Sequence, residues 1–372
     1  MDFDLTPEHQ ELRNSVRSFV EQKVFPQIWK YEEKSIFPMD IFREMGQRGF
    51  LRAYIPVEHG GLGLGTMAFC IISEEMCKAG FGMSHYGHVQ TVRMLIEFGT
   101  ETQRSRYLSK LLTGELLGAT AIAEPTAGSS LATMQTTVEK KGNTFVLNGA
   151  KTLINEAAEA DVINVYTKGG EGISVFLVEK QTPGFRILKK LNPMGMRSSP
   201  IYDFELRNCE VNSEQLVGVL GGGFQTFFSA FNFTRLGNAS ACIGMAQAAL
   251  DNTIKYLKQR FVGTRNATEF QGLRWRIADM STELEAARLL RDRAAIMLDQ
   301  KKDMGMETSR VKLFAVEVAK RVVRDCIQSV GGYGCLRENF FDLYLRDVAI
   351  IGTAGGTLEV MRNNIAKRLL GS

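Results

Sequence analysis

The sequence AEPTAGSS at residues 123–130 lies where a helical block gives way to a β-rich segment. It belongs to a longer stretch, residues 120–161, which continues through a hairpin signal and contains KTLIN at residues 151–155. A Gly-Ser turn that follows a proline, with small residues around it, lets backbone N–H groups approach a flat or anionic ligand closely. The same loop could be an ordinary turn, so the flanking sequence has to decide between the two interpretations.

Residues 1–115 have the pattern of helices. Thr6, Pro7 and Glu8 form a helix start, because they supply an N-cap hydroxyl, a proline in the first turn and an acid near the positive end of the dipole. Further helices are expected over residues 42–50, 67–79, 87–98 and 103–112. The glycine-rich run at residues 55–65 suggests a dinucleotide site, but no strand–turn–helix unit surrounds it, which favours a loop.

Residues 116–220 change to a β pattern. The turn at residues 141–143, flanked by apolar residues, is typical of a hairpin. Further strands are expected over residues 162–166, 173–178 and 201–211, the first two separated by a glycine-rich turn at 169–172. Strands this short, with turns between them, predict a small antiparallel sandwich or barrel.

Residues 221–372 return to helix. Apolar residues recur at helical spacing in three stripes, which run through residues 243–257, 284–297 and 311–327, the last including Phe314. Long stripes joined by short turns predict an antiparallel four-helix bundle. The predicted fold class is therefore α+β and mostly helical, with a helical domain at 1–115, an antiparallel β-domain at 116–220 and a helical bundle at 221–372.

Composition excludes several functional classes. A net charge of +4 over 372 residues gives no case for nucleic acid. No apolar run approaches the length of a membrane span, and the first residues, MDFD, contain no apolar signal core. Six scattered cysteines are expected to be free thiols in a reducing cytoplasm, and four histidines without a ligand-spaced cluster argue against a metal site.

Five separated motifs, in order along the whole chain, resemble those of the acyl-CoA dehydrogenase family. They are PVEHGGLG at 56–63, EPTAGS at 124–129, LNGAK at 147–151, GMRSS at 195–199 and QSVGGYG at 328–334. The resemblance implies a flavoprotein that binds FAD and removes two hydrogens from neighbouring carbons of an acyl thioester. In that chemistry a carboxylate takes the α-proton while the β-hydrogen leaves as hydride to the flavin.

The resemblance also implies roles for residues at matching positions. Those expected at the flavin or the thioester are Ile122, Ala123, Gly128 and Ser129, with Leu153, Ile154 and Asn155 on the other flavin side. Those expected at the ADP part of the cofactor, partly across a subunit contact, are Arg260, Gln328, Gly331 and Gly332. Thr357 and Glu359 would close the site, and Arg235 would shape the thioester pocket. A homotetramer or homodimer built through the C-terminal bundle is expected.

The departures from the family pattern cluster around the chemistry. The position of the usual catalytic glutamate holds Gly355, and the position that carries it in other members holds Thr234. Neither side chain can replace a carboxylate as a base. Near the flavin, Ala123, Leu153 and Asn155 stand where a hydroxyl residue, an aromatic residue and a threonine are usual, and GT at 263–264 replaces the customary Phe-Gly.

The sequence MSHYGHVQ at residues 83–90 falls where family members line the acyl cavity. Its polar side chains, which include Tyr86, suggest a polar or ring-bearing acyl group. His88 could act as a relocated base, since imidazole titrates near neutrality, or it could simply pack at the start of a helix. Glu156 is the carboxylate nearest to the flavin loop in sequence, and an exposed loop charge is the interpretation favoured for it.

Three functions stay open on the sequence. The first is an acyl-thioester dehydrogenase with a relocated base, which takes its substrate from CoA or a carrier protein and passes electrons to an electron-transfer flavoprotein or to oxygen. The second is a flavoenzyme with changed chemistry, such as thioester oxygenation or ring formation through an α-carbanion. The third is a catalytically silent flavin-binding subunit.

Overall fold

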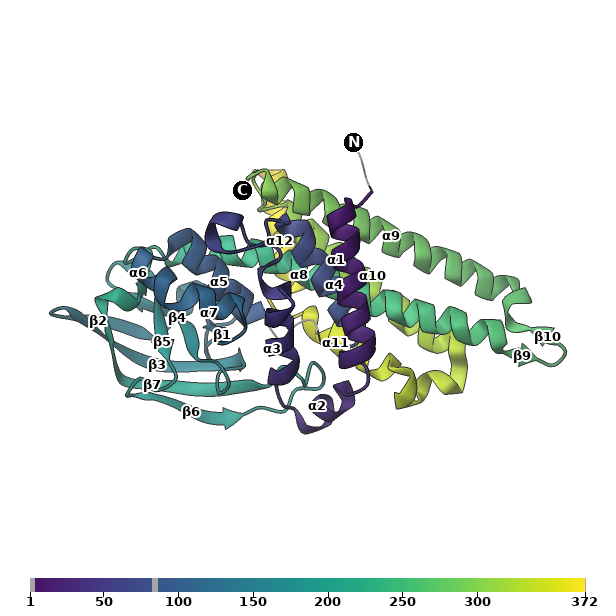
Figure 1. Cartoon of the computed structure of the whole chain (residues 1–372), viewed down its shortest axis with the longest axis horizontal. Helices are drawn as coiled ribbons and strands as arrows, with labels where there is room; N and C mark the ends of the chain where they lie inside the picture. Colours follow the sequence, from purple (N-terminus) through teal and green to yellow (C-terminus); the bar gives the residue numbers. More distant parts are fainter. Residues whose placement is uncertain (1–3, 82–85, 372) are drawn as a thin grey trace.

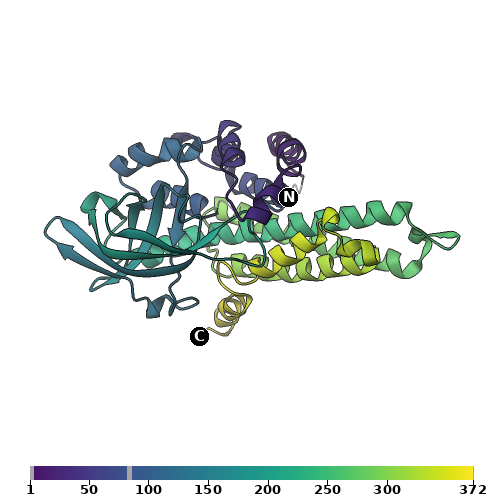
Figure 2. The same cartoon turned by 90° about the horizontal axis from the view of Figure 1, so that it is seen from below.

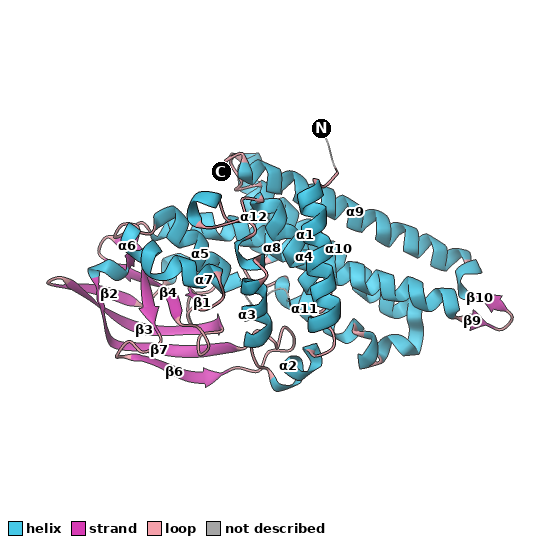
Figure 3. Ribbon diagram, viewed as in Figure 1, coloured by secondary structure: helices cyan, strands magenta, loops and turns pink. Residues whose placement is uncertain are grey.

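A computed structural model describes residues 4–81 and 86–371 of the chain. The chain forms an N-terminal set of helices, a β-sheet region and a set of long C-terminal helices, which confirms the predicted α+β class (Figure 1, Figure 3). The β-region lies at one end of the molecule. The long C-terminal helices extend away from it to a small hairpin at the other end (Figure 2).

The N-terminal region begins at the predicted helix start. The Thr6 hydroxyl accepts a hydrogen bond from the backbone of His9, and Pro7 occupies the first turn. The helices are α1 (Pro7–Phe19), α2 (Ile28–Lys34), α3 (Met39–Gln47), α4 (Gly65–Cys77), α5 (Tyr86–Phe98), α6 (Glu101–Gln103) and α7 (Ser109–Leu112). The sequence did not predict α2. The glycine-rich run before α4 forms a short 3₁₀ turn and a loop, as expected.

The central sheet has the strand order β6-β7-β3-β2-β4-β5-β8, with β1 paired to β4. Its strands are β1 (Gly118–Ala121), β2 (Thr137–Lys141), β3 (Thr144–Asn155), β4 (Val162–Gly169), β5 (Gly172–Glu179), β6 (Phe185–Lys190), β7 (Ile201–Asn212) and β8 (Leu216–Val217). The neighbours are antiparallel except that β1 and β2 each pair with β4 in parallel. The sheet is therefore mixed, because a long connection through the β2–β3 hairpin separates β1 from β4.

The C-terminal region consists of α8 (Gly223–Gln259), α9 (Gln271–Asp299), α10 (Glu307–Val330), α11 (Phe341–Ile351) and α12 (Leu358–Leu370). A hairpin of β9 (Phe261–Val262) and β10 (Arg265–Asn266) joins α8 to α9 at the far end of the molecule (Figure 1). Phe314 was predicted to lie on the apolar stripe of α10, but its side chain is exposed. In the described part of the chain, no helix has both the length and the apolarity to cross a membrane.

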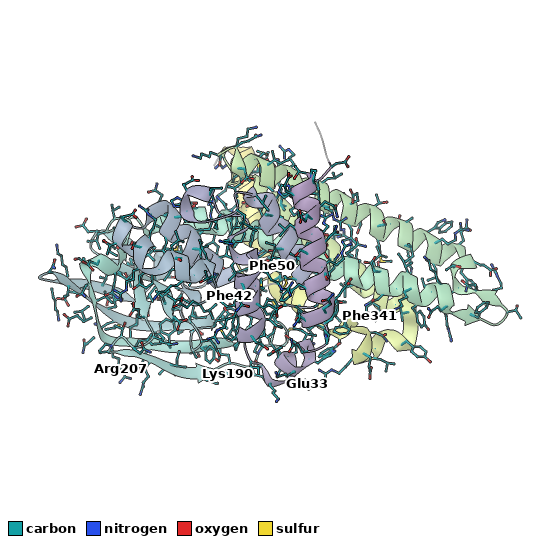
Figure 4. All side chains as sticks on the ribbon, in the orientation of Figure 1. Glu33, Phe42, Phe50, Lys190, Arg207 and Phe341 are labelled. Carbon is teal, nitrogen blue, oxygen red and sulfur yellow. The ribbon has the colours of Figure 1, made fainter. Side chains whose placement is uncertain are left out.

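The three regions meet around α8 and α5. Helix α4 is almost entirely buried and packs along α8, while α5 packs on β1. Phe42 of α3 lies in the interior where the N-terminal helices approach the sheet (Figure 4). At the other side of the sheet, Lys190 at the end of β6 donates a hydrogen bond to the backbone of Ser35, which follows α2. This packing places the loops of the sheet next to the middle of the C-terminal helices.

Candidate functional site

A buried ion pair holds the loop at residues 122–130. The Lys151 ammonium lies 2.7 Å from Glu124 Oε1 and also donates to the carbonyl of Ile122. The backbone of Glu124 exchanges two hydrogen bonds with that of Ala127, which closes a tight turn. Gly128 and Ser129 then stand exposed at the tip, with open space where a Gly128 Cβ would lie. The loop therefore has a rigid base and an accessible tip.

Electrostatics explains why this pair is stable away from water. Burial alone would raise the pKa of Glu124, but hydrogen bonds from Lys151, Thr136 and Gln135 outweigh it and lower the pKa. Burial lowers the pKa of Lys151 to about 8, against the attraction of Glu124. Each charge thus depends on the other for its compensation.

Strand β3 carries a bulge beside this loop. Lys151 pairs with Phe204 of β7 and Ile154 with Tyr202, so β3 has one more residue than β7 between these pairs. Leu153 lies in the bulge with φ of 57°, and its apolar side chain is 58% exposed. Because a bulge redirects a side chain, it turns Leu153 outward. The backbone of Thr152 also bonds to Ala123, which ties the bulge to the loop.

Behind the bulge, Glu156 is fully buried. It accepts a hydrogen bond from the Ser199 hydroxyl, which in turn accepts one of 2.7 Å from the Asn155 amide. Burial raises the pKa of Glu156 well above its usual value, against the hydrogen bond from Ser199. The interpretation of Glu156 as an exposed loop charge was wrong, because residues 199–200 of the neighbouring segment cover it.

Gly355 lies in the loop between α11 and α12, with φ of 65°. A Cβ atom at this position would lie 2.7 Å from the Asn238 amide nitrogen and 3.7 Å from Lys312 Nζ. Lys312, on α10, donates hydrogen bonds to the carbonyls of Ala354 and Gly356. The buried ammonium group of Lys312 therefore anchors the α11–α12 loop through its backbone carbonyls.

Thr234 and Arg235 lie on α8 close to this loop. Arg235 Nη2 would be 3.9 Å from a Cβ atom at Gly356, so the guanidinium group reaches the loop. The Thr234 hydroxyl turns back toward the carbonyl of Ala230 and accepts a bond of 3.3 Å from Gln90 of α5. Thr357 caps α12 by accepting from Val360, and Glu359 is exposed in the first turn.

His88 lies on the opposite face of α5 from Gln90. Its Nδ1 accepts a hydrogen bond of 3.2 Å from the Gly118 backbone, and its ring packs edge-on against Phe42. The side chain has no exposed surface. Tyr86 is also buried, against Phe69 and Gly237. Residues 83–85 of the same motif lie outside the described residues.

A second cavity, of about 460 Å³, brings together all four residues expected at the ADP group. Arg260 lines it from the end of α8, and Gln328, Gly331 and Gly332 line it from the end of α10. Gly331 has φ of 72°, and a Cβ atom added to either glycine would meet no other atom within 4 Å, so the backbone is open to a ligand. Two exposed glycines, which let a ligand approach the backbone closely, and a guanidinium group suit a pyrophosphate.

This cavity lies at the end of α8 beside the β9–β10 hairpin, whereas the loop at residues 122–130 follows β1 in the β-region (Figure 1). A larger cavity of about 1350 Å³, lined by charged residues of α1, α4, α8 and α9, contains none of the predicted site residues. Among residues 4–81 and 86–371, no group of three or more His, Cys, Asp or Glu side chains is placed to hold a metal ion.

Comparison with known proteins decides what this two-part arrangement is. The acyl-CoA dehydrogenase N-terminal domain matches residues 6–115, the middle domain residues 119–209 and the C-terminal domain residues 221–370. The chain belongs to the acyl-CoA dehydrogenase family. The family consists of flavin oxidoreductases, so the predicted family and the predicted enzyme class are confirmed.

Individual relatives are similar to this chain over almost its whole length. The 3-(aryl)acrylate reductase of Clostridium sporogenes is 35% identical, over 98% of this chain and 99% of the relative. The structure of butyryl-CoA dehydrogenase from Megasphaera elsdenii matches with a TM-score of 0.96 and 31% identity over the full length of both chains. The structure of the FAD complex of PigA matches with a TM-score of 0.94 and 27% identity over 99% of each chain.

The residues predicted for the flavin ring and for the ADP part form two groups in the fold. The first group belongs to the loop after β1 and the bulged end of β3, and consists of Ile122, Ala123, Gly128, Ser129, Leu153 and Asn155. The second group lines the far cavity and consists of Arg260, Gln328, Gly331 and Gly332. Of the other predicted residues, Thr234, Arg235, Gly355, Thr357 and Glu359 lie in or beside the α11–α12 loop. The catalytic roles proposed for His88 and Tyr86 stay predictions. The contacts of His88 favour the alternative of packing, because its ring contacts Phe42 of α3 and the Gly118 backbone of β1.

Sequence reasoning missed Lys312 and Asn238. Lys312 has a signal, because it falls at helical spacing among the buried residues Thr308, Val316 and Ala319, where a charged side chain is rare. Asn238 has no such signal. Its position beside Gly355 depends on how α8 packs against the α11–α12 loop.

Proposed function

We propose that this protein is an FAD-dependent oxidoreductase that acts on the α and β carbons of an acyl thioester, the acyl group being polar or ring-bearing. The observation that carries this proposal is the buried Glu124–Lys151 ion pair, which anchors an open loop beside the bulge that exposes Leu153. A flat ring system fits such a surface, because an outward apolar side chain gains from being covered. The relative named 3-(aryl)acrylate reductase supports a ring-bearing acyl group.

FAD is the cofactor, and the two residue groups fit its two halves. The loop at residues 122–130 and the bulge would hold the ring system, with Asn155 as an amide hydrogen-bonding group at its edge. Arg260, Gln328, Gly331 and Gly332 would hold the pyrophosphate and adenosine end. When bound, FAD supplies the two-electron acceptor for the hydrogen that leaves the β-carbon.

The protein's own residues have to position the thioester and accept the α-proton. Arg235 and the α11–α12 loop stand where the thioester is expected. Gly355 and Thr234 leave both usual base positions without a carboxylate, so direct α-proton abstraction needs another acceptor. The absence of a carboxylate at these two positions is the observation that favours a second candidate reaction, namely thioester oxygenation or ring formation on the same scaffold.

The placement of the two residue groups in different regions supports assembly into a homotetramer or homodimer, in which one subunit completes the FAD site of another. Exposed apolar side chains on the C-terminal helices and their hairpin would be covered in such a contact, among them Trp275, Leu289, Ile296, Phe261 and Val262.

The acyl group would be carried by CoA or a carrier protein, and electron-transfer flavoprotein or oxygen would accept the electrons. We also propose a cytoplasmic location, because the six cysteines are free thiols, as is usual in a reducing compartment.

The test is anaerobic reduction of the purified yellow protein by saturated thioesters, with butyryl-CoA and 3-phenylpropionyl-CoA as the pair. Bleaching of the flavin absorbance, with the matching enoyl product found by mass spectrometry, is expected for the aryl substrate. In a parallel aerobic assay with reduced flavin, oxygen consumption with a hydroxylated product would favour the second reaction, and so would a cyclised product in either assay. A protein that binds no FAD after reconstitution would contradict both.

A further inference from the structure

Among the described residues, two of the four buried basic side chains have no carboxylate partner. Arg291 pairs with Glu74 and, at 2.6 Å, with Asp292, and Lys151 pairs with Glu124. Arg235 is only 4% exposed, yet its guanidinium group donates a 3.2 Å bond to the neutral amide of Asn232 and pairs with no acid. Lys312 is completely buried and donates only to backbone carbonyls.

Burying Arg235 and Lys312 without an opposite charge costs the folded chain free energy. A buried charge is tolerated when an opposite charge and good hydrogen bonds compensate for lost hydration. Burial lowers the pKa of Arg235 to about 10, and burial together with the charge of Arg235 lowers the pKa of Lys312 to about 7. In contrast, Glu74 and Asp292 raise the pKa of the equally buried Arg291.

The donors of this pair converge on one small region. A Cβ atom at Gly355 would lie 2.7 Å from the Asn238 amide and 3.7 Å from the Lys312 ammonium, and a Cβ atom at Gly356 would lie 3.9 Å from Arg235 Nη2. Arg235 Nε and Asn238 Oδ1 are buried without a hydrogen-bond partner in the described part of the chain. The two glycines are themselves half-buried, so part of this loop is accessible from outside.

We propose that Arg235, Lys312 and Asn238 form an anion site under the α11–α12 loop, and that a carboxylate on the acyl group of the substrate occupies it. This inference rests on the proposed function and narrows the polar alternative for its acyl group to one that carries a carboxylate. Because Gly355 stands where the family carries its glutamate, the carboxylate would lie within one or two carbons of the thioester. The substrate would then supply the negative charge that the chain lacks at this position.

The experiment measures binding to the FAD-loaded protein, by calorimetry and by the change in flavin absorbance. Methylmalonyl-CoA is compared with isobutyryl-CoA, and succinyl-CoA with butyryl-CoA, so that each pair differs in a carboxylate against a methyl group. We expect at least one dicarboxylic thioester to bind tenfold or more tightly than its partner. Equal Kd values within both pairs would overturn the anion site.

Variants at Gly355 provide the matched control. Gly355→Glu places a carboxylate of the chain beside Lys312 and Arg235, and it should abolish the tenfold preference. Gly355→Gln has nearly the same shape and the same backbone strain without the charge, and it should keep most of the preference. Loss of the preference in both variants alike would mean that the effect is steric, which contradicts the proposal.

A second measurement does not need these variants to fold. The unfolding midpoint of the FAD-loaded wild type is followed with sodium succinate, with inorganic phosphate and with the thioester pairs. Stabilisation by phosphate as large as that by the dicarboxylic thioesters would indicate a solvent anion and overturn the substrate assignment. Thioesters that bleach the flavin without any carboxylate preference would remove the anion site alone. Failure of every thioester to bind would remove the proposed function as well.

Discussion

Glu156 is a buried carboxyl group at the end of β3, and burial raises its pKa. Its folded pKa lies well above its usual value, so the unfolded chain releases this proton at lower pH than the folded chain does. The stability that the buried acid contributes is therefore complete below about pH 4.5 and is lost as the pH rises toward the folded pKa.

We predict that Glu156→Gln is more favourable at pH 8 than at pH 5, relative to wild type. Glutamine keeps the shape of the neutral acid and can still bond to Ser199, but it has no proton to lose. The difference should grow by up to about 1.4 kcal/mol per pH unit within this window. Urea unfolding of the FAD-loaded proteins at both pH values measures it. Glu139→Gln, on the exposed face of β2, is the control and should show no such trend.

His88 allows the packing and base interpretations to be separated. We predict that His88→Ala lowers the free energy of unfolding by about 2–4 kcal/mol, because it leaves a cavity beside Phe42 and removes the acceptor of the Gly118 N–H group. The kcat of the folded fraction should change less than tenfold. Thermal unfolding and turnover are compared with those of His59→Ala. An unchanged unfolding midpoint with a hundredfold loss of kcat would instead identify His88 as the base.

The loop at residues 122–130 depends on one ion pair across two elements. We predict that Lys151→Met lowers the free energy of unfolding by about 3–5 kcal/mol, because it leaves Glu124 buried without its counter-charge. Adding Glu124→Gln should recover part of this loss, which gives a double-mutant cycle measured by urea unfolding. Strictly additive losses from the two substitutions would show that the charges do not interact.

The bulge in β3 is the other element that defines this surface. Leu153 lies in the left-handed region, which costs a branched side chain about 1–2 kcal/mol. Folding retains this conformation because Lys151 on one side and Glu156 on the other are both anchored in the interior. An outward apolar side chain held by two buried neighbours is a preformed surface for a flat ligand.

At the scale of the whole molecule, the residues expected at the two ends of FAD belong to different regions, the loop after β1 and the cavity at the ends of α8 and α10. We predict complementation between subunits. Ser129→Trp should block the flavin loop, and Arg260→Glu should repel the pyrophosphate, so that each variant alone loses FAD. When the two are mixed, unfolded and refolded together, some mixed contacts join an intact loop to an intact cavity.

The yellow colour should then return in up to about half of the sites of each mixed dimer contact. FAD content per subunit, measured by absorbance after gel filtration, gives the answer. Refolding each variant separately is the control for the procedure. If mixing restores no FAD while the oligomers form, each chain must build its site from its own residues.

Local chemistry was enough to predict much of this protein. The Thr6 cap, the hairpin at residues 141–143 and the apolar stripes of the C-terminal helices follow from turn preferences and spacing within a few residues. The continuous motifs at 124–129 and 328–334 predicted two groups of cofactor residues through their resemblance to a known family, and these roles stay predictions. Strand β1 and the mixed sheet were not accessible in this way, since β1 and β4 are brought together by a connection of about forty residues.

Only the tertiary structure determined which ionisable side chains of the site are buried and which of them are paired. Glu156 was taken for a surface charge because nothing near it in sequence shows that residues 199–200 cover it. Lys312, Arg235 and Asn238 come from two helices and meet under a loop more than forty residues further along the chain. Desolvation and Coulomb interactions depend on distances between such remote groups, so residue types and spacing alone leave their protonation and pairing undetermined.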